Sequence, residues 1–288
     1  MIKIRATDFD LEKTLDSGQV FHWQKAGTGF VGTIGDRAVY VEQNGESFKV
    51  RFGEMAKSPR RLLGRIVEHY FALDHPLGKI CDSFPKDPVM NAARDFCRGL
   101  RVIRQPKWEC LATFICSSMK QVAHIRQISL ALRKRFGEPR RAGSDVVYTF
   151  PSPRRIAEAS DSALRECALG YRAKNLHATA RLVSSREADL EAWKKLGDDE
   201  LREQLCALPG VGPKVANCVM LFGYERLRAF PIDVWIERVL RKQYLPRRGK
   251  VTAQGLRKFS ETYFGQHGGY AQQYLFHHAR MASRRSGH

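Results

Sequence analysis

The chain has 288 residues, 43% of them hydrophobic, which is enough for two modest domains with buried cores. Lysine and arginine together number 49 against 30 aspartates and glutamates, so the formal net charge is +19. No hydrophobic run is long enough to cross a membrane and the N-terminus lacks the apolar core of a signal peptide, which argues against a membrane protein.

The positive charge is concentrated after residue 80. Residues 1–80 hold 12 basic and 10 acidic side chains, a net charge of +2, whereas residues 81–288 hold 37 and 20, a net charge of +17. This asymmetry favours a C-terminal part that binds a polyanion, with nucleic acid as the first candidate. A generally basic protein without such a ligand is the alternative that charge alone leaves open.

The first 57 residues predict a small antiparallel sheet with one buried face. Three segments have the composition of short strands: 30–34, 38–41 and 47–52. Turn-forming pairs, Gly35-Asp36 and Asn44-Gly45, separate them. Ser58-Pro59 is typical of a helix N-cap and first turn, and helical spacing continues from there to Tyr70.

From about residue 86 the hydrophobic spacing is helical almost throughout. The periodic segments are 86–99, 107–117, 120–136, 172–186, 198–207, 213–223, 233–244, 252–264 and 268–283. Residues 138–155, with three prolines, predict the longest loop. The expected fold class is α+β and mainly α, with an N-terminal antiparallel β-sheet domain carrying one helix at 1–80 and a helical domain at 81–288.

The seven cysteines argue against a metal centre. None stands in a Cys-x-x-Cys pair, and their number is odd. A zinc site or an iron–sulfur cluster is therefore not expected, and the pattern favours the reduced thiols of an intracellular protein.

Residues 208–218, Leu-Pro-Gly-Val-Gly-Pro-Lys-Val-Ala-Asn-Cys, join a turn to the start of a helix. Gly210 and Gly212 can adopt backbone angles closed to other residues, and Pro213 suits the first helical position. Free N–H groups and the helix dipole make such a junction a ready anion site. Lys214 among these donors suggests a phosphate ligand or a nucleophile. A plain loop-to-helix junction with a solvated lysine would explain the isolated motif equally well.

Asp233 follows Lys214 by 19 residues, within Phe-Pro-Ile-Asp-Val-Trp at 230–235. It precedes a periodic apolar run, so it is a candidate helix N-cap. A glycine hairpin, a lysine two residues past it and a downstream Pro-x-Asp together resemble the helix-hairpin-helix DNA glycosylase superfamily. The hairpin would occupy about residues 198–223, and the lysine marks the bifunctional glycosylase/lyase members.

Within that superfamily the chain most resembles the 8-oxoguanine DNA glycosylases of the eukaryotic type, which also occur in some bacteria. Four further stretches carry the resemblance: SGQVFHW at 17–23, ECLATFICSS at 109–118, LGYRA at 169–173 and YAQQYLF at 270–276. With the hairpin and the Pro-x-Asp motif, they span residues 17–276 in the family's order.

The resemblance implies covalent catalysis. In this family a lysine amine attacks the anomeric carbon of a flipped nucleotide and displaces the damaged base, and the resulting Schiff base permits β-elimination, which nicks the strand. Lys214 is thereby the expected nucleophile, and Asp233 the carboxylate that stabilises the cationic sugar of the transition state. Attack requires the neutral amine, which desolvation and the positive end of a helix both favour.

The resemblance also assigns a pocket for the damaged base. Gly18 matches the glycine whose backbone carbonyl accepts from the N7–H that 8-oxoguanine has and guanine lacks. Cys218 and Phe276 match the residues that sandwich the base, and Gln272 matches the amide that reads its Watson–Crick edge. Taken alone, Gly18 would be a turn glycine, and Cys218 and Phe276 would be core residues.

Other matching positions would contact DNA around the lesion. Tyr171 and Arg172 match the residues that wedge the duplex and contact the orphan cytosine. The amides of Gly210, Gly212 and Val215 are expected to bind backbone phosphate. Hairpins of this kind often bind a monovalent cation through carbonyls, and no other cofactor is implied.

Three positions depart from the family pattern. Met119 replaces an asparagine, and His124 an arginine, that touch the orphan cytosine in the family. Trp235 stands where the animal enzymes have a histidine near the phosphates. The first two substitutions predict a relaxed preference for the base opposite the lesion.

The expected partner is double-stranded DNA containing oxidised guanine, bound by a monomer in the cytoplasm or nucleoid. Two alternatives stay open at this point. Another helix-hairpin-helix glycosylase, an alkylpurine or adenine remover, is disfavoured by Lys214, which those enzymes generally lack. A non-catalytic DNA-binding module that uses the hairpin for phosphate is the second.

Overall fold

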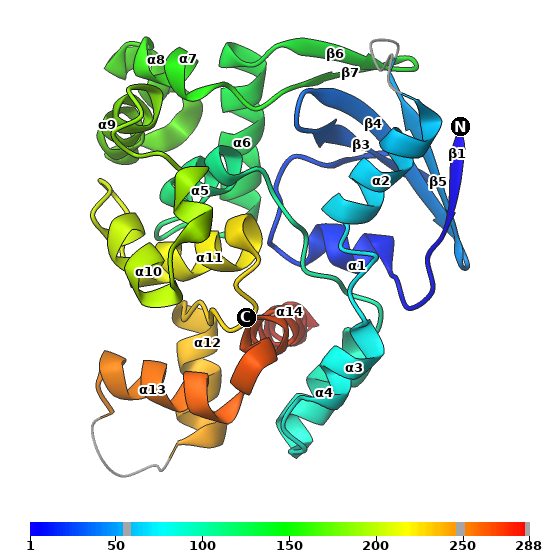
Figure 1. Cartoon of the computed structure of the whole chain (residues 1–288), viewed down its shortest axis with the longest axis vertical. Coiled ribbons are helices and arrows are strands. Elements are labelled where there is room, and N and C mark those ends of the chain that lie inside the picture. The colour runs from blue at the N-terminus through cyan, green and yellow to red at the C-terminus, as the bar shows by residue number, and fades with distance from the viewer. Residues whose placement is uncertain (54–58, 246–250, 286–288) are drawn as a thin grey trace.

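The computed structural model describes residues 1–53, 59–245 and 251–285, with only the backbone at 284 and 285. An N-terminal antiparallel sheet precedes a larger helical part (Figure 1), so the expected fold class is confirmed. The Ser58 cap prediction lies outside the described residues.

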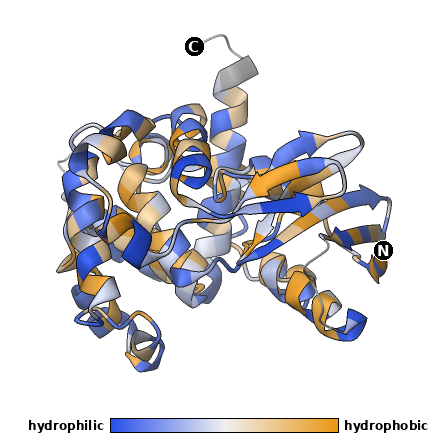
Figure 2. Ribbon diagram, turned by 90° about the horizontal axis from the view of Figure 1, so that it is seen from above, coloured by the Kyte–Doolittle hydropathy of each residue, from blue (hydrophilic) through white to orange (hydrophobic). Residues whose placement is uncertain are grey.

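Five antiparallel strands form the N-terminal sheet, in the spatial order β1-β5-β4-β3-β2. They are β1 (Ile2–Arg5), β2 (Gln24–Ala26), β3 (Gly29–Ile34), β4 (Arg37–Asn44) and β5 (Ser47–Phe52). The last three correspond to the predicted segments, and Gly35 and Gly45 make the predicted turns with positive φ. Along β5, Phe48 and Val50 are completely buried whereas Lys49 between them is not, and similar banding is visible along the strands in Figure 2.

A short helix, α1 (Leu11–Asp16), interrupts the strand region that the sequence predicted. The side chain of Asp10 caps it by accepting a hydrogen bond from the backbone N–H of Lys13 at 2.9 Å. Leu11 and Leu15 bury its apolar side among the strands' core residues. The cap and this four-residue apolar spacing are the local signals for the helix.

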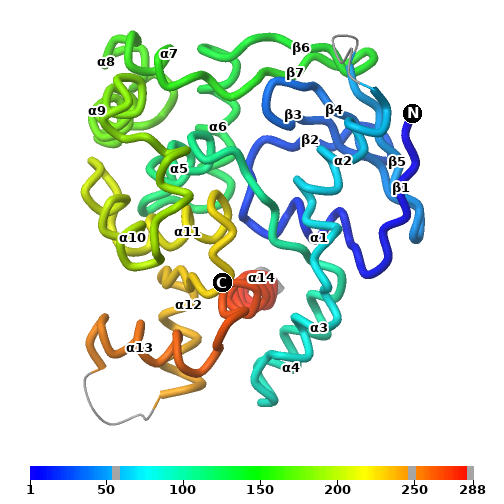
Figure 3. The backbone as a smooth tube through the Cα atoms, in the orientation of Figure 1, coloured from blue at the N-terminus to red at the C-terminus, as the bar shows by residue number. Residues whose placement is uncertain are grey.

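The loop predicted at 138–155 is wrong in its first half. Strands β6 (Pro139–Ala142) and β7 (Asp145–Tyr148) form a hairpin that turns at Gly143. Ala142 and Val147 pack against Val31 and Ala38 of the large sheet, and Figure 3 shows the hairpin reaching over β3 and β4. The distant sheet supplies the apolar contact that the hairpin's polar sequence lacks.

All nine periodic segments contain helices. In chain order, the helices longer than five residues from residue 59 onward are α2 (Arg60–Tyr70), α3 (Leu77–Asp82), α4 (Pro88–Phe96), α5 (Lys107–Cys116), α6 (Val122–Phe136), α9 (Arg172–Ser184), α10 (Asp198–Cys206), α11 (Pro213–Tyr224), α12 (Val234–Val239), α13 (Ala253–Tyr263) and α14 (Gly268–Arg285). Shorter helical turns not predicted individually are α7 (Pro153–Ala157), α8 (Asp161–Leu164), η1 (Arg165–Leu169), η2 (Ala192–Lys195) and η4 (Gly265–His267). One further turn, η3 (Leu240–Tyr244), continues α12 within its predicted segment.

The sheet and the helices have separate hydrophobic cores, and each core includes a residue from the other part of the chain. Phe21, from the N-terminal segment, packs in the helical core, whereas Ile103 packs in the core of the sheet. In the helical core, α11 lies against α5, where the rings of Phe114 and Phe222 stack at 5.5 Å between centroids. Because the two cores interlock, the domain boundary expected at residue 80 stays a prediction.

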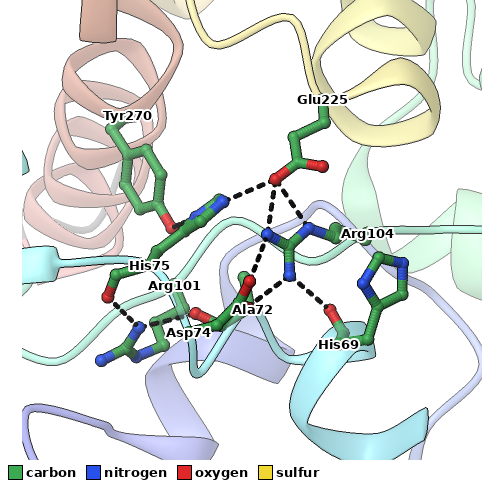
Figure 4. Close-up of polar contacts among 8 residues, drawn as sticks. All are labelled: His69, Ala72, Asp74, His75, Arg101, Arg104, Glu225 and Tyr270. Carbon is green, nitrogen blue, oxygen red and sulfur yellow. Dashed lines mark hydrogen bonds and ion pairs between the residues drawn. The ribbon is translucent and has the colours of Figure 1, made fainter. Parts of the chain in front are cut away.

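A polar cluster ties the C-terminal end of α11 to the chain that leads out of the sheet (Figure 4). Glu225, in a left-handed conformation after α11, accepts from His75 Nε2 at 2.7 Å and from Arg104 Nε at 2.7 Å. Arg104 also binds both carboxylate oxygens of Asp74, and His75 Nδ1 lies 2.8 Å from the hydroxyl of Tyr270 in α14. The cluster therefore fixes α11 and α14 against the same linker.

The Glu225 ion pairs predict an acid-dependent loss of stability. Hydrogen bonds from His75 and Arg104 lower the pKa of Glu225 from 4.5 to about 2. Its stabilising effect is therefore complete above pH 4.5 and disappears as the pH falls towards 2. We expect Glu225→Gln to lower the free energy of unfolding by about 1 kcal/mol at pH 7, a modest value because the group is half-exposed. Urea unfolding of both proteins across this pH range measures the difference, which must narrow below pH 4.5; a constant difference would contradict the assignment.

Candidate active site

The turn between α10 and α11 needs glycine at one position only. Gly210 has φ +79, and a Cβ atom there would lie 2.7 Å from the Cβ of Asn175. Gly212 has φ −97 in extended backbone, with open space where a Cβ would be. Gly210 therefore adopts the special backbone angle that glycine permits, whereas Gly212 does not, and its lack of a side chain instead keeps the start of α11 open.

The N-terminus of α11 has no side-chain cap. Pro213 is its first residue, as predicted, and the first backbone hydrogen bond runs from Ala216 N to Gly212 O at 2.9 Å. Within the described chain, the amides of Gly210, Gly212 and Val215 donate no hydrogen bond. These three donors are the ones expected to bind phosphate, and they remain available at the positive end of the helix dipole.

A cleft of about 800 Å³ opens beside this helix start. Its walls come from the α5–α6 turn, the start of α11, the start of α12, α14 and the segment after α1. Seven of the predicted site residues line it: Gly18, Met119, Gly212, Lys214, Val215, Asp233 and Phe276. Segments more than 200 residues apart in sequence thus meet at one cavity.

Lys214 places its amine inside the cleft. Its Nζ donates to Ser117 Oγ at 3.1 Å and lies 5.2 Å from the ring centroid of Phe114. Ser117 Oγ in turn donates to the carbonyl of Phe114 at 2.7 Å, so it presents a lone pair to the lysine. Among the described residues no carboxylate lies within the 4.0 Å ion-pair distance of this amine. A neutral hydroxyl and an aromatic face therefore orient the amine.

Asp233 is the N-cap of α12, as the sequence predicted. Its Oδ1 accepts from the backbone N–H of Ile236 at 2.9 Å. Burial raises the pKa of Asp233, while the Ile236 N–H and the charge of Lys214 act in the opposite direction. The carboxylate therefore makes a structural hydrogen bond, and Asp233 also lines the same cleft as Lys214.

Gly18 presents an unpaired backbone carbonyl. It has φ +83, and a Cβ atom there would lie 3.0 Å from Cε1 of Phe276. Only glycine satisfies both the backbone angle and this contact. Its carbonyl accepts no hydrogen bond from any residue that the structure describes.

The other base-pocket residues are buried to different degrees. Phe276 is half-buried and lines the cleft, whereas Cys218 and Gln272 are buried and do not. Burial raises the pKa of the Cys218 thiol to about 11, so this residue offers a neutral sulfur surface. The Oε1 atom of Gln272 is buried without a hydrogen-bond partner in the described chain. An unsatisfied buried amide is costly, which is consistent with a group reserved for a ligand.

Tyr171 and Arg172 form a stacked pair at the start of α9. Tyr171 is 60% exposed, and its ring centroid lies 4.3 Å from the guanidinium carbon of Arg172. Arg172 is buried and donates through Nε and Nη2 to the carbonyl of Ser118, and through Nη1 to that of Leu169. Two of its five N–H groups are left for another partner. The proposed contact with an orphan base stays a prediction.

Met119 and His124 both lie at the surface beside the cleft. Met119 is 93% exposed and has φ +53. An exposed apolar side chain in this left-handed conformation is unusual, and asparagine adopts that conformation more readily. His124 lies exposed in the first turn of α6.

Ser117, which accepts a hydrogen bond from the amine of Lys214, was not predicted from the sequence. The residue is within the quoted 109–118 stretch, but nothing there singles it out. A polar side chain buried at the end of the apolar helix α5 is the signal that could have found it. Arg280 also lines the cleft and was not predicted.

The described ranges contain no group of three or more histidine, cysteine, aspartate or glutamate side chains placed to hold a metal ion. All seven cysteines are free thiols. Among the helices that the structure describes, none is long and apolar enough to span a membrane.

Comparisons with known proteins cover almost the whole chain. Residues 1–111 match the N-terminal domain of 8-oxoguanine DNA glycosylase, and residues 112–262 match the HhH-GPD superfamily of base excision DNA repair proteins. A probable N-glycosylase/DNA lyase of Methanothermobacter thermautotrophicus is 28% identical over 98% of this chain and 96% of its own. N-glycosylase/DNA lyase OGG1 of Arabidopsis thaliana is 29% identical over 96% of this chain and 78% of its own.

A solved structure gives the same result. The 8-oxoguanine glycosylase/lyase of Clostridium acetobutylicum, bound to double-stranded DNA with cytosine opposite 8-oxoguanine, has a TM-score of 0.89 and 29% identity. The alignment covers 98% of this chain and 99% of that one.

The two hairpin glycines provide a matched test of the turn geometry. Gly210→Ala should lower the free energy of unfolding by roughly 1–3 kcal/mol, because it forces a left-handed angle and crowds Asn175. Gly212→Ala should leave stability nearly unchanged, because its Cβ meets open space. Urea unfolding of the two variants measures this contrast, and equal losses would show that the turn differs from the one described.

Proposed function

The chain belongs to the family of 8-oxoguanine DNA glycosylases with a helix-hairpin-helix domain, and from this membership we propose that it excises 8-oxoguanine from duplex DNA and nicks the strand through a Schiff base on Lys214. The observation that carries the proposal is the position of Lys214. Its amine lies at the uncapped start of α11, in a cleft shared with Asp233 and with Gly18, whose carbonyl accepts no hydrogen bond from the described residues.

Binding depends first on charge. The net charge of +17 after residue 80 attracts duplex DNA over a broad surface. The free amides of Gly210, Gly212 and Val215 would hold one phosphate at the mouth of the cleft. This contact would bring the flipped nucleotide's sugar to the side of the cleft where Lys214 lies.

In the chemical step, the nitrogen of Lys214 bonds to the anomeric carbon, and the bond from that carbon to the base breaks. The base leaves with the electron pair and takes up a proton. Asp233 stabilises the positive charge that develops on the sugar. Ring opening gives the Schiff base, from which loss of a C2′ proton expels the 3′ phosphate and nicks the strand.

The orientation of the Lys214 amine follows from its neighbours. Ser117 Oγ accepts from it at 3.1 Å, and the Phe114 ring covers one side. Neither neighbour is an anion, so a hydrogen bond and an aromatic face orient the amine, without an ion pair.

Recognition of the damaged base uses the remaining pocket residues. The Gly18 carbonyl would accept from the N7–H of 8-oxoguanine, and guanine would leave it unpaired at an energetic cost. The Gln272 amide would read the Watson–Crick edge, with Phe276 and Cys218 on the two faces of the base. We include in the proposal a monomer that acts in the cytoplasm or nucleoid and requires no cofactor beyond an optional monovalent cation at the hairpin.

Lys214→Gln tests the covalent mechanism. The variant should give no borohydride-trapped protein–DNA adduct and almost no base release, because glutamine has no nucleophilic amine. It should still bind duplex DNA containing 8-oxoguanine, which gel-shift titration would measure. Adducts formed by the variant would assign the Schiff base to another residue. A wild-type protein that binds DNA without adducts or base release would instead be a non-catalytic module.

Discrimination of the opposite base is expected to be weak. Met119 and His124 provide fewer donors for cytosine than asparagine and arginine would, and each lost base contact is worth ~1–3 kcal/mol. The protein should therefore excise 8-oxoguanine opposite all four bases, with a cytosine-to-adenine rate ratio below about a hundredfold. Single-turnover excision from duplexes that differ only in the opposite base measures this ratio.

The double variant Met119→Asn/His124→Arg should raise the preference for cytosine. The single variant Met119→Asn is its control for folding, because the left-handed backbone at position 119 accommodates asparagine. A wild-type preference of a hundredfold or more would assign cytosine recognition to Arg172 or to another residue.

A further inference from the structure

One face of α14 contacts residues 16–18, the segment that contains the Gly18 carbonyl proposed to recognise the damaged base. Gln273, Phe276 and Arg280 follow one another at intervals of three and four residues, so they share a helical face. Gln273 Nε2 donates to the carbonyl of Ser17 at 2.9 Å, and the Phe276 ring lies against Gly18. Arg280 Nη2 donates to the carbonyl of Asp16.

A second glutamine holds the other side of Gly18. Gln105 Nε2 donates to the carbonyl of Gln19 at 2.7 Å. Gln105 and Gln273 are both buried; Gln105 lies between α4 and α5, whereas Gln273 lies in α14. The carbonyls immediately before and after Gly18 are thus each fixed by a buried side-chain donor.

The peptide group that joins Gly18 to Gln19 lies between these two fixed carbonyls and makes no hydrogen bond within the described chain. Neither the Gly18 carbonyl nor the Gln19 N–H has a hydrogen-bond partner among the described residues. Glycine tolerates many backbone angles, so an unanchored Gly18 peptide could rotate its carbonyl away from the cleft. With the peptide planes on both sides fixed, ψ of Gly18 and φ of Gln19 can change only together, so the carbonyl has fewer orientations than in an unanchored segment.

We infer that Gln273 and Gln105 are positioning residues for damage recognition, which aim the Gly18 carbonyl at the N7–H of the flipped base. The inference rests on the proposed function. An acceptor restricted before binding pays a smaller ordering cost when 8-oxoguanine arrives, and it has fewer orientations in which to avoid the N7 lone pair of guanine. The two glutamines thereby act on the choice of base without touching it.

Gln273→Met tests this role, because methionine has similar volume but no N–H donor. Single-turnover excision of 8-oxoguanine should fall about tenfold, the effect of roughly one hydrogen bond. Nicking of a duplex with a preformed abasic site should stay at the wild-type rate, because that reaction uses Lys214 and involves no base. In a Lys214→Gln background, the ratio of affinities for duplexes with 8-oxoguanine and with guanine should also fall about tenfold.

Tyr274→Phe is the matched control. The Tyr274 hydroxyl donates from the same helix to another backbone carbonyl, that of Leu100, at 2.9 Å. The same hydroxyl accepts from Cys81 Sγ at 3.7 Å, so its loss removes two hydrogen bonds of α14, neither of which involves the Gly18 segment. This variant should keep the wild-type ratio of base excision to abasic-site nicking.

Gln105→Met tests the inference independently, and it replaces Gln273→Met if that variant does not fold. It should show the same selective loss of base excision. The inference is overturned if both folded variants excise and discriminate as the wild type does, or if abasic-site nicking falls in parallel with excision. Failure of the proposed function would look different, since the wild-type protein itself would then neither excise 8-oxoguanine nor nick an abasic site.

Discussion

The burial of α11 is the constraint on which the site depends. Nearly every residue from Val215 to Tyr224 is buried, so the helix is fixed on all sides by the core and by the Glu225 ion pairs at its end. Only its first turn meets the cleft. The backbone donors and the Lys214 amine are therefore held by a helix that is buried along almost its whole length, which would suit the orientation of a nucleophile.

Local patterns predicted the features whose causes are local. Turn pairs such as Asn44-Gly45 and the strands beside them, the proline at the start of α11, and the Asp233 cap all depend on a few neighbouring residues. The family resemblance then assigned the site residues. Lys214, Asp233, Gly18 and Phe276 come together around one cleft in the structure.

Features that the sequence did not reveal depend on distant contacts. The hairpin β6–β7 is stabilised by the N-terminal sheet, about 100 residues away in sequence. Gly212 looked equivalent to Gly210 in the motif, yet only Gly210 packs against Asn175. The hydrogen bond from Gln273 to Ser17 joins residues 256 positions apart. Gln272 and Gln273 are adjacent in the sequence, which does not reveal which of the two faces the ligand.

Asp233 caps a helix, and the proposed reaction would use the same carboxylate. Burial favours its neutral form, but a neutral carboxyl would be a poorer acceptor for the Ile236 N–H and could not stabilise a cationic sugar. The cap hydrogen bond and the nearby positive charge of Lys214 both favour the anion. In the proposed reaction the attacking amine would be neutral, and the Ile236 N–H would still donate to the carboxylate. The positive charge that would develop on the sugar would then take the place of the ammonium charge beside Asp233.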